Sequence, residues 1–159
     1  MATIAGQHIT QFDGRVIEFL GSCRNVLARD VISDTFTLVR NYDTNTLTLV
    51  TDGRQVEVTF TGTVKVDGSA TDAPFAFANT EVVRTRDSIV VRNRGRFSLE
   101  CDVTREACVF RMSGWYHGRV AGLMGTYTNE QVDDFVSPNG ELASDVTELA
   151  ASWETSGEN

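Results

Sequence analysis

The sequence predicts an all-β fold, an antiparallel β-sandwich with a short C-terminal helix. Apolar residues alternate with polar or β-branched residues in short segments, which is the period of a half-buried strand. Turn-forming residues separate these segments at spacings of about ten residues, as in sandwiches and barrels. The chain has 159 residues, of which 41% are hydrophobic, and it contains only 2 Pro. This length and composition favour a single domain, residues 1–159, with its own core.

The alternation is clearest in six segments, residues 35–40, 46–50, 56–60, 63–66, 88–92 and 96–100. Turn formers lie between or before them, at residues 13–14, 43–45, 52–53, 67–68 and 93–95. Residues 69–79 contain Pro74 and two alternating phenylalanines. Because proline cannot donate a hydrogen bond to a β-ladder, we expect this segment to be a loop or an edge strand.

Only the end of the chain has a helical pattern. Ser144 or Asp145 can cap a turn in which Glu148 follows three or four residues later. The apolar residues that would share one helix face are Val146, Leu149, Ala150 and Trp153. We therefore expect a short helix here.

The net charge of −8 argues against nucleic acid as the main partner. Residues 84–119 carry eight arginines and four acids, whereas residues 126–159 carry eight acids and no Lys or Arg. The acidic segment is either a solvated face or a place where some carboxylates hold a cation. No apolar run reaches the roughly 20 residues that span a bilayer. The first residues lack a basic segment followed by an apolar one, so we expect no signal peptide and interpret the chain as an excised fragment.

The sequence offers little for catalysis. Its two histidines are His8, in an alternating segment that favours a half-exposed strand, and His117, between residues that favour a turn. Zinc-ligand spacings, phosphate-binding glycine loops and nucleophile elbows are absent from the sequence. The adjacent carboxylates Asp133 and Asp134 would point in opposite directions in an extended chain, which suits metal coordination better than acid–base pairing. We expect a protein that is not an enzyme.

Two of the three cysteines, Cys101 and Cys108, lie symmetrically about a turn. Symmetric pairing places Asp102 opposite Ala107 and lets the two cysteines face each other across an antiparallel hairpin. Closing the eight-residue ring would stabilise the fold by roughly 2.5 kcal/mol on the loop-entropy model. The alternative is two buried free thiols. A disulfide implies an oxidising compartment and hence a secreted, extracellular protein.

Two groups of motifs go beyond fold class. Near the start are Phe12-Asp13-Gly14, Gly21-Ser22-Cys23 and Leu27-Ala28-Arg29-Asp30; later come Gly122-Leu123-Met124-Gly125, Asp133-Asp134-Phe135 and Pro138-Asn139-Gly140. Their order and separation resemble the von Willebrand factor type D (VWD) domain over essentially the whole chain. The form of the later motifs is most similar to that domain in large lipid-transfer apolipoproteins, the apolipophorins, vitellogenins and crustacean lipoproteins.

The resemblance implies a calcium site, because family members often bind Ca²⁺ through the Asp of Phe-Asp-Gly and a loop after Gly-Leu-x-Gly. The matching positions here are Asp13, Thr126, Thr128, Glu130 (through its carbonyl), Asp133 and Asp134. Alternate loop residues followed by adjacent carboxylates can converge on one hard cation. The two threonines replace stronger ligands, so binding would be weak. The alternative is a turn in which these acids cap backbone amides.

The chain also departs from the family pattern. Val31 and Ala121 occupy the positions of two cysteines that are bonded to each other in the family, which implies that they touch in the folded state. Cys23 keeps its family position, but its usual partner lies near or past Asn159. Cys23 would therefore be free or linked outside this segment.

Together these features indicate a non-catalytic, secreted module of a lipid-transport apolipoprotein, with the rest of a lipoprotein or lipid particle as its partner. Self-association is left open. The alternative is a carrier that holds a lipid or a carotenoid pigment on or between its sheets. The side chains that would line such a site are Phe75, Phe77, Trp115, Tyr116 and Met124, which otherwise belong to an ordinary core. A third hypothesis, an enzyme or a luciferase-like accessory domain, rests only on the occurrence of the resembled family in mosaic proteins.

Overall fold

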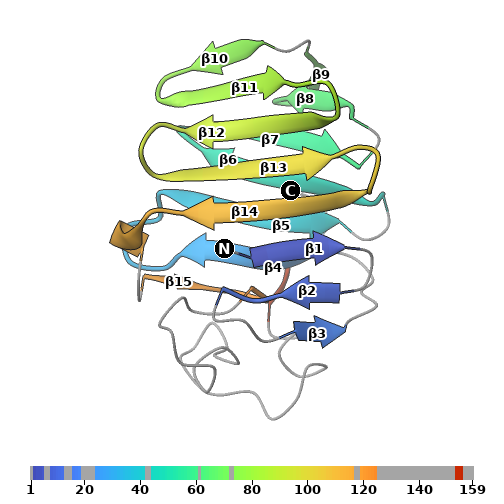
Figure 1. The fold of residues 1–159 in the computed structure, drawn as a ribbon. Helices are drawn as coiled ribbons and strands as arrows, with labels where there is room; N and C mark the ends of the chain where they lie inside the picture. The colour runs from blue at the N-terminus through green and yellow to red at the C-terminus, as the bar shows by residue number, and fades with distance from the viewer. Residues whose placement is uncertain are drawn as a thin grey trace.

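The computed structural model describes residues 2–5, 8–12, 16–18, 24–41, 44–60, 62–71, 74–116, 119–124 and 153–155. Within them, two antiparallel sheets lie face to face (Figure 1). The all-β sandwich prediction is thereby confirmed. Of the predicted C-terminal helix, which begins at Ser144 or Asp145 and includes Trp153, only Trp153 lies within the described residues. Trp153 is in a turn that leads directly into a strand, so the helix is not shown. The helical element among the described residues is a single 3₁₀ turn, η1 (Gly114–Tyr116), and no helix in this part of the chain is long and apolar enough to cross a membrane.

The first sheet has the order β10 (Phe75–Phe77), β11 (Thr80–Arg84), β12 (Ser88–Asn93), β13 (Phe97–Asp102), β14 (Ala107–Met112), β1 (Ala2–Ala5), β2 (His8–Thr10) and β3 (Val16–Glu18). The second has the order β15 (Val120–Ala121), β4 (Arg24–Asp30), β5 (Phe36–Asn41), β6 (Thr46–Thr51), β7 (Arg54–Thr59), β8 (Val64–Val66) and β9 (Ser69–Ala70). A further short strand, β16 (Glu154–Thr155), also pairs with β4.

The six predicted segments are confirmed as strands β5, β6, β7, β8, β12 and β13. The turns at Asp52-Gly53 and Asp67-Gly68 have positive φ at both residues, which is the conformation that joins two strands through a two-residue loop. Residues 69–79 contribute the end strands β9 and β10, as the edge-strand alternative anticipates. Local turn chemistry therefore accounts for the pairing of β6 with β7 and of β8 with β9.

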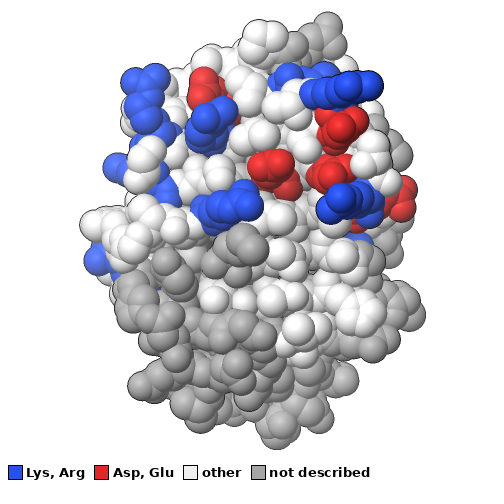
Figure 2. All heavy atoms as spheres, viewed as in Figure 1, with Lys and Arg blue, Asp and Glu red and all other residues white. Residues whose placement is uncertain are grey.

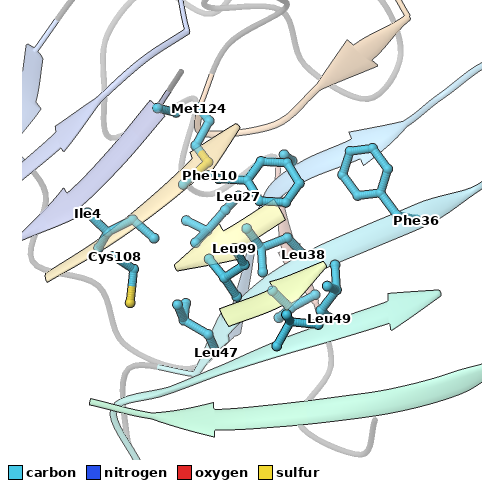
Figure 3. Packing of buried hydrophobic residues seen from close by; sticks show 14 of the residues in the cluster. Ile4, Leu27, Phe36, Leu38, Leu47, Leu49, Leu99, Cys108, Phe110 and Met124 are labelled. Carbon is cyan, nitrogen blue, oxygen red and sulfur yellow. The ribbon is translucent and has the colours of Figure 1, made fainter. Parts of the chain in front are cut away.

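The core fills the space between the sheets (Figure 3). Leu38 and Leu49 from the second sheet face Leu99 and Phe110 from the first, and all four are at most 1% exposed. At one end, Phe36 packs against Phe97, Phe110 and Tyr116, with ring centroids 5.0 to 5.4 Å away. Each fully buried side chain of this size contributes roughly 1.5–3 kcal/mol.

A polar bridge also joins the two sheets. Asp52, in the turn between β6 and β7, accepts hydrogen bonds on Oδ2 from Asn79 N (3.2 Å), Thr80 Oγ1 (2.8 Å) and Asn93 Nδ2 (3.2 Å). These three donors belong to β11, β12 and the turn before β11. Because Thr80 and Asn93 are buried, the carboxylate satisfies groups that water does not reach.

Candidate functional site

The motif that begins at Gly122 lies against β4. Val120 pairs with Asp30, and Ala121 pairs with Arg29. The next residues continue along β4 through two backbone hydrogen bonds: Leu123 N donates to Val26 O (3.1 Å), and Met124 N donates to Leu27 O (2.7 Å). Leu123 and Met124 are fully buried. The backbone of the motif is thus fixed along the strand that carries the Leu-Ala-x-Asp motif.

Only glycine fits at position 122. Its φ is +139°, which L-residues rarely adopt, and an added Cβ would lie 2.6 Å from Leu27 O and 2.8 Å from Leu27 C. Both atoms belong to the backbone of β4, where the register shifts between Val26 and Ala28. The close approach of two backbones explains the glycine that opens the Gly-Leu-x-Gly motif.

The two motif groups meet at Phe12 and Met124. Phe12 N donates to Met124 O (2.9 Å), and Gln11 Nε2 donates to Leu123 O (2.9 Å) from a side chain with no exposed surface. Asp13 follows Phe12 directly in the sequence, and Thr126 follows Met124 by two residues. The bond between Phe12 and Met124 therefore brings together the two chain segments that the calcium hypothesis needs.

The proposed calcium ligands themselves, Asp13, Thr126, Thr128, Glu130, Asp133 and Asp134, lie outside the described residues. Among the residues that the structure describes, no three His, Cys, Asp or Glu side chains form a cluster that could hold a metal. Of the two histidines, His8 is exposed on β2 and His117 is outside the described part of the chain. The calcium site stays a prediction.

The disulfide between Cys101 and Cys108 is confirmed. The residues pair directly across β13 and β14 with their Cα atoms 4.1 Å apart, and Asp102 pairs with Ala107 as predicted. Both cysteines are 1% exposed, so the disulfide lies on the core side of the first sheet. The third cysteine, Cys23, lies outside the described residues.

Val31 and Ala121 are close along the ladder but are not a directly opposed pair. Ala121 lies opposite Arg29, and Val31 N donates instead to Arg119 O (2.9 Å). Such a diagonal offset places side chains about 7–8 Å apart or somewhat less. Ala121 is buried whereas Val31 is 43% exposed, so their contact stays a prediction.

The five residues suggested for an apolar ligand are distributed over separate places. Phe75 and Phe77 lie half-buried on the end strand β10, with their rings 5.9 Å apart. Tyr116 and Met124 have no exposed surface and belong to the core, whereas Trp115 is 52% exposed. Since β10 is four strands from β14, the phenylalanines are on the order of 19 Å from the strand that leads into η1.

A groove of about 610 Å³ lies along the second sheet. Its lining residues are Arg24, Val26, Arg29, Asp30, Val31, Asp34, Thr37, Val39, Val50 and Gln55. None of the five suggested aromatic and methionine residues is among them. Three of the four valines come from β4, β5 and β6, and Val31 comes from the turn after β4; together they give the groove an apolar strip between polar neighbours.

Asp30 organises the turn that follows β4. Its Oδ1 accepts from Ile32 N and Ser33 N (both 3.0 Å), and its Oδ2 accepts from Thr35 N (3.2 Å) and Thr35 Oγ1 (2.7 Å). Burial opposes ionisation, but these hydrogen bonds outweigh it and hold the pKa of Asp30 below its usual value. The carboxylate therefore stays charged and fixes the turn.

The same network extends to Tyr116. Its hydroxyl is hydrogen-bonded to Thr35 Oγ1 (2.9 Å), and burial raises the pKa of the phenol. The turn after β4 and the 3₁₀ turn after β14 are thus joined through one chain of polar contacts. The sequence motif contains Asp30, but its role depends on Thr35 and Tyr116, whose proximity is not encoded in the motif.

The match to known families agrees with this arrangement. A model of the von Willebrand factor type D domain matches residues 2–141. Apolipophorin of Galleria mellonella is 34% identical over 155 residues, which cover 94% of this chain, and apolipophorins of Manduca sexta are 32% identical over 158 residues, which cover 96% of it. Apolipophorins of Locusta migratoria are 30% identical over 149 residues, or 92% of the chain.

These relatives are much longer than the chain, which spans 10%, 5% and 4% of their respective lengths. The family match covers both motif groups up to Glu141, together with the strands that position them. The chain therefore belongs to the von Willebrand factor type D domain family.

Proposed function

We propose that the chain is a non-catalytic module of a secreted lipid-transport protein, where it acts in assembly or recognition of the lipid particle. This proposal rests on the similarity to apolipophorins, which are 30–34% identical to the chain in three relatives over 92% or more of its length. Because the chain spans a tenth or less of each relative, lipid loading would belong to the remainder of the longer protein and its particle. The buried disulfide supports an oxidising, extracellular setting.

An antibody against this chain tests the proposal. Extracellular fluid of the source organism is separated by buoyant density, and each fraction is probed under reducing conditions. We expect the antibody to detect a polypeptide several times larger than 17.5 kDa in the fractions that float with lipid. Detection only in lipid-free fractions at the bottom of the gradient would contradict the proposal.

We also propose a weak calcium site formed by Asp13, Asp133 and Asp134 with oxygens from Thr126, Thr128 and Glu130. The hydrogen bond between Phe12 and Met124 supports it, because it joins the segments that lead into both halves of the ligand set. Without the cation, three nearby carboxylates would repel one another. Calcium would then stabilise the fold by mass action.

A thermal titration checks this site. The melting temperature should rise with calcium up to millimolar concentrations, the range of weak extracellular modules. Asp133→Asn should reduce this gain more than Glu141→Gln, because Glu141 lies beyond Pro138 and outside the ligand set. A melting curve that calcium leaves unchanged across this range would assign these acids to turn caps.

The second candidate function is transport of a lipid or carotenoid. It is favoured by the groove of about 610 Å³ on the second sheet, whose size is within the range of small-molecule sites. Its valine strip, rather than the aromatic residues suggested by the sequence, would contact the ligand. Absorbance of the purified protein outside the ultraviolet, or lipid in an organic extract, would support this role. Their absence from protein purified from its native source would exclude it.

A further inference from the structure

Exposed apolar side chains gather at one end of the sandwich. Among the described residues, the large apolar side chains with the greatest exposure are Val16 (60%), Val31 (43%), Ile32 (63%) and Trp115 (52%). Val31 and Ile32 begin the turn after β4, and Trp115 lies in η1 after β14. Val16 is elsewhere, on the edge strand β3 of the first sheet, three strands from β14 (Figure 1).

Arg119 joins these two turns into one surface. Its carbonyl accepts from Val31 N (2.9 Å), and its Nη2 donates to Ser33 Oγ (2.8 Å). The carbon of its guanidinium group lies 4.1 Å from the centre of the Trp115 ring, a cation–π distance. We call Val31, Ile32, Trp115 and Arg119 the end patch.

The end patch is presented on a fixed backbone. Asp30 accepts from the amides of Ile32 and Ser33, and Thr35 is bonded to both Asp30 and Tyr116. These bonds use the backbone amide of Ile32, so the turn does not depend on an isoleucine side chain at this position. Ile32 is 63% exposed, and with Val31 and Trp115 it forms a group of exposed apolar side chains rather than an isolated one, which is the pattern that marks an interaction surface.

The surroundings of the end patch are basic. Arg94 and Arg96 are exposed in the turn between β12 and β13, and Arg96 O accepts from Ser113 N (2.7 Å), two residues before Trp115. Figure 2 shows Lys and Arg side chains along the left edge of the molecule, the end at which β12 and β14 finish in Figure 1. Of the two acids in the neighbouring turn, Asp30 is buried and bonded internally, which leaves Asp34 exposed.

We propose that the end patch docks the chain on a phospholipid surface that carries anionic headgroups, with Ile32 and Trp115 entering the headgroup region and Arg96 and Arg119 binding phosphate. Tryptophan favours this region because its ring is amphipathic, and the guanidinium fork matches phosphate geometry. A stable protein interface needs about 800 Å² per partner, which is more than the four side chains of the end patch supply. The inference rests on the proposed function, since it names the partner of the module.

Vesicle flotation tests the docking. The 159-residue chain is mixed with vesicles of phosphatidylcholine and phosphatidylserine (about 3:1) in EDTA, which prevents calcium bridging, and is floated in a density gradient. We expect the chain to float and Ile32→Glu to weaken its partitioning by about ten-fold or more. Arg96→Gln should weaken it less, and more at low salt than at high salt. Val16→Glu is the matched control, because it places the same charge at an equally exposed apolar site, and it should float like the parent chain.

Fluorescence gives a second measurement. Trp115 is exposed whereas Trp153 is 2% exposed, so a blue shift and quenching by brominated lipid should report on Trp115. Melting curves of each variant in buffer confirm that it folds.

Failure of the folded chain to float would overturn the inference. Equal loss in Ile32→Glu and Val16→Glu would also overturn it, because the contact would then lie elsewhere. Self-association that Ile32→Glu abolishes, without flotation, would assign the end patch to a second copy of the chain and overturn lipid docking. None of these results affects the density fractionation that tests the proposed function, so the two can fail separately.

Discussion

Substitution of Gly122 by alanine should be among the most damaging single changes in the described part of the chain. The new Cβ would meet Leu27 O at 2.6 Å, Leu27 C at 2.8 Å and Ala28 N at 3.0 Å, all of them backbone atoms of β4. Backbone cannot rotate away as a side chain can, so the strands must separate. The hydrogen bonds from Leu123 N to Val26 O and from Met124 N to Leu27 O would lengthen as a result.

The expected cost follows from these parts. A φ of +139° strains an L-residue by roughly 1–3 kcal/mol, and two weakened backbone hydrogen bonds cost about 1 kcal/mol each. The sum is about 3–5 kcal/mol, a large share of the roughly 5–15 kcal/mol by which proteins are stable. At about 2–4 °C per kcal/mol for a chain of this length, the melting temperature should fall by roughly 6–20 °C.

Gly53→Ala provides the matched control. Gly53 also has a positive φ, +79°, but a Cβ there would meet no atom within 4 Å. Its cost should be limited to backbone strain of roughly 1–2 kcal/mol. Urea unfolding of both variants gives the comparison directly. If Gly122→Ala were within about 1 kcal/mol of Gly53→Ala, the argument from close backbone approach would be wrong.

Three further predictions concern the disulfide, Asp30 and Asp52. The double variant Cys101→Ser with Cys108→Ser should have a free energy of unfolding in urea that is lower by roughly 2.5 kcal/mol. Non-reducing peptide mapping of the parent chain should find the two cysteines joined to each other, and alkylation of either one would contradict this. Because the pKa of Asp30 is lower in the folded chain than the unfolded value near 3.9, its stabilisation is fully present above that value and is lost as pH falls through the folded pKa. Asp30→Asn should therefore cost about 3 kcal/mol at neutral pH and progressively less in acid, and a cost independent of pH would refute the assignment. Asp52→Ala should cost about 2–3 kcal/mol, because it leaves the buried Thr80 hydroxyl without an acceptor and removes one of the two acceptors of Asn93 Nδ2, the other being Thr80 Oγ1. A cost below about 0.5 kcal/mol, which is typical of surface substitutions, would show that the bridge between the sheets contributes little.

Local features of the sequence predicted the hairpins well. Asp52-Gly53 and Asp67-Gly68 specify two-residue turns whatever surrounds them, and the symmetric spacing of Cys101 and Cys108 specifies their register. In each case the residues that determine the hairpin are within a few positions of the contact in the sequence. Forming such a local contact costs little loop-closure entropy, so the turn residues alone are enough to predict it.

Long-range pairing could not be predicted in this way. The pairing of β15 with β4 places Arg29, not Val31, opposite Ala121, and neither residue type reveals that register. The identity of an aromatic residue does not predict whether it is buried: Tyr116 is buried whereas its neighbour Trp115 is exposed. Burial depends on the strands that pack around the side chain, and these are distant in the sequence.

The place of β1 in the first sheet has a consequence for how the chain is made. Ala2–Ala5 pairs with β2 on one side but on the other with Ala107–Met112, about 100 residues later. At a synthesis rate of about 5–20 residues per second, roughly 5–20 s pass before β14 exists. The hairpins of the second sheet can form in that interval, while Ile4 waits without its core neighbour on β14. Newly made protein therefore passes through a stage in which the apolar strand β1 is open to chaperones and to other nascent chains, and the sandwich closes only after two-thirds of these 159 residues have been synthesised.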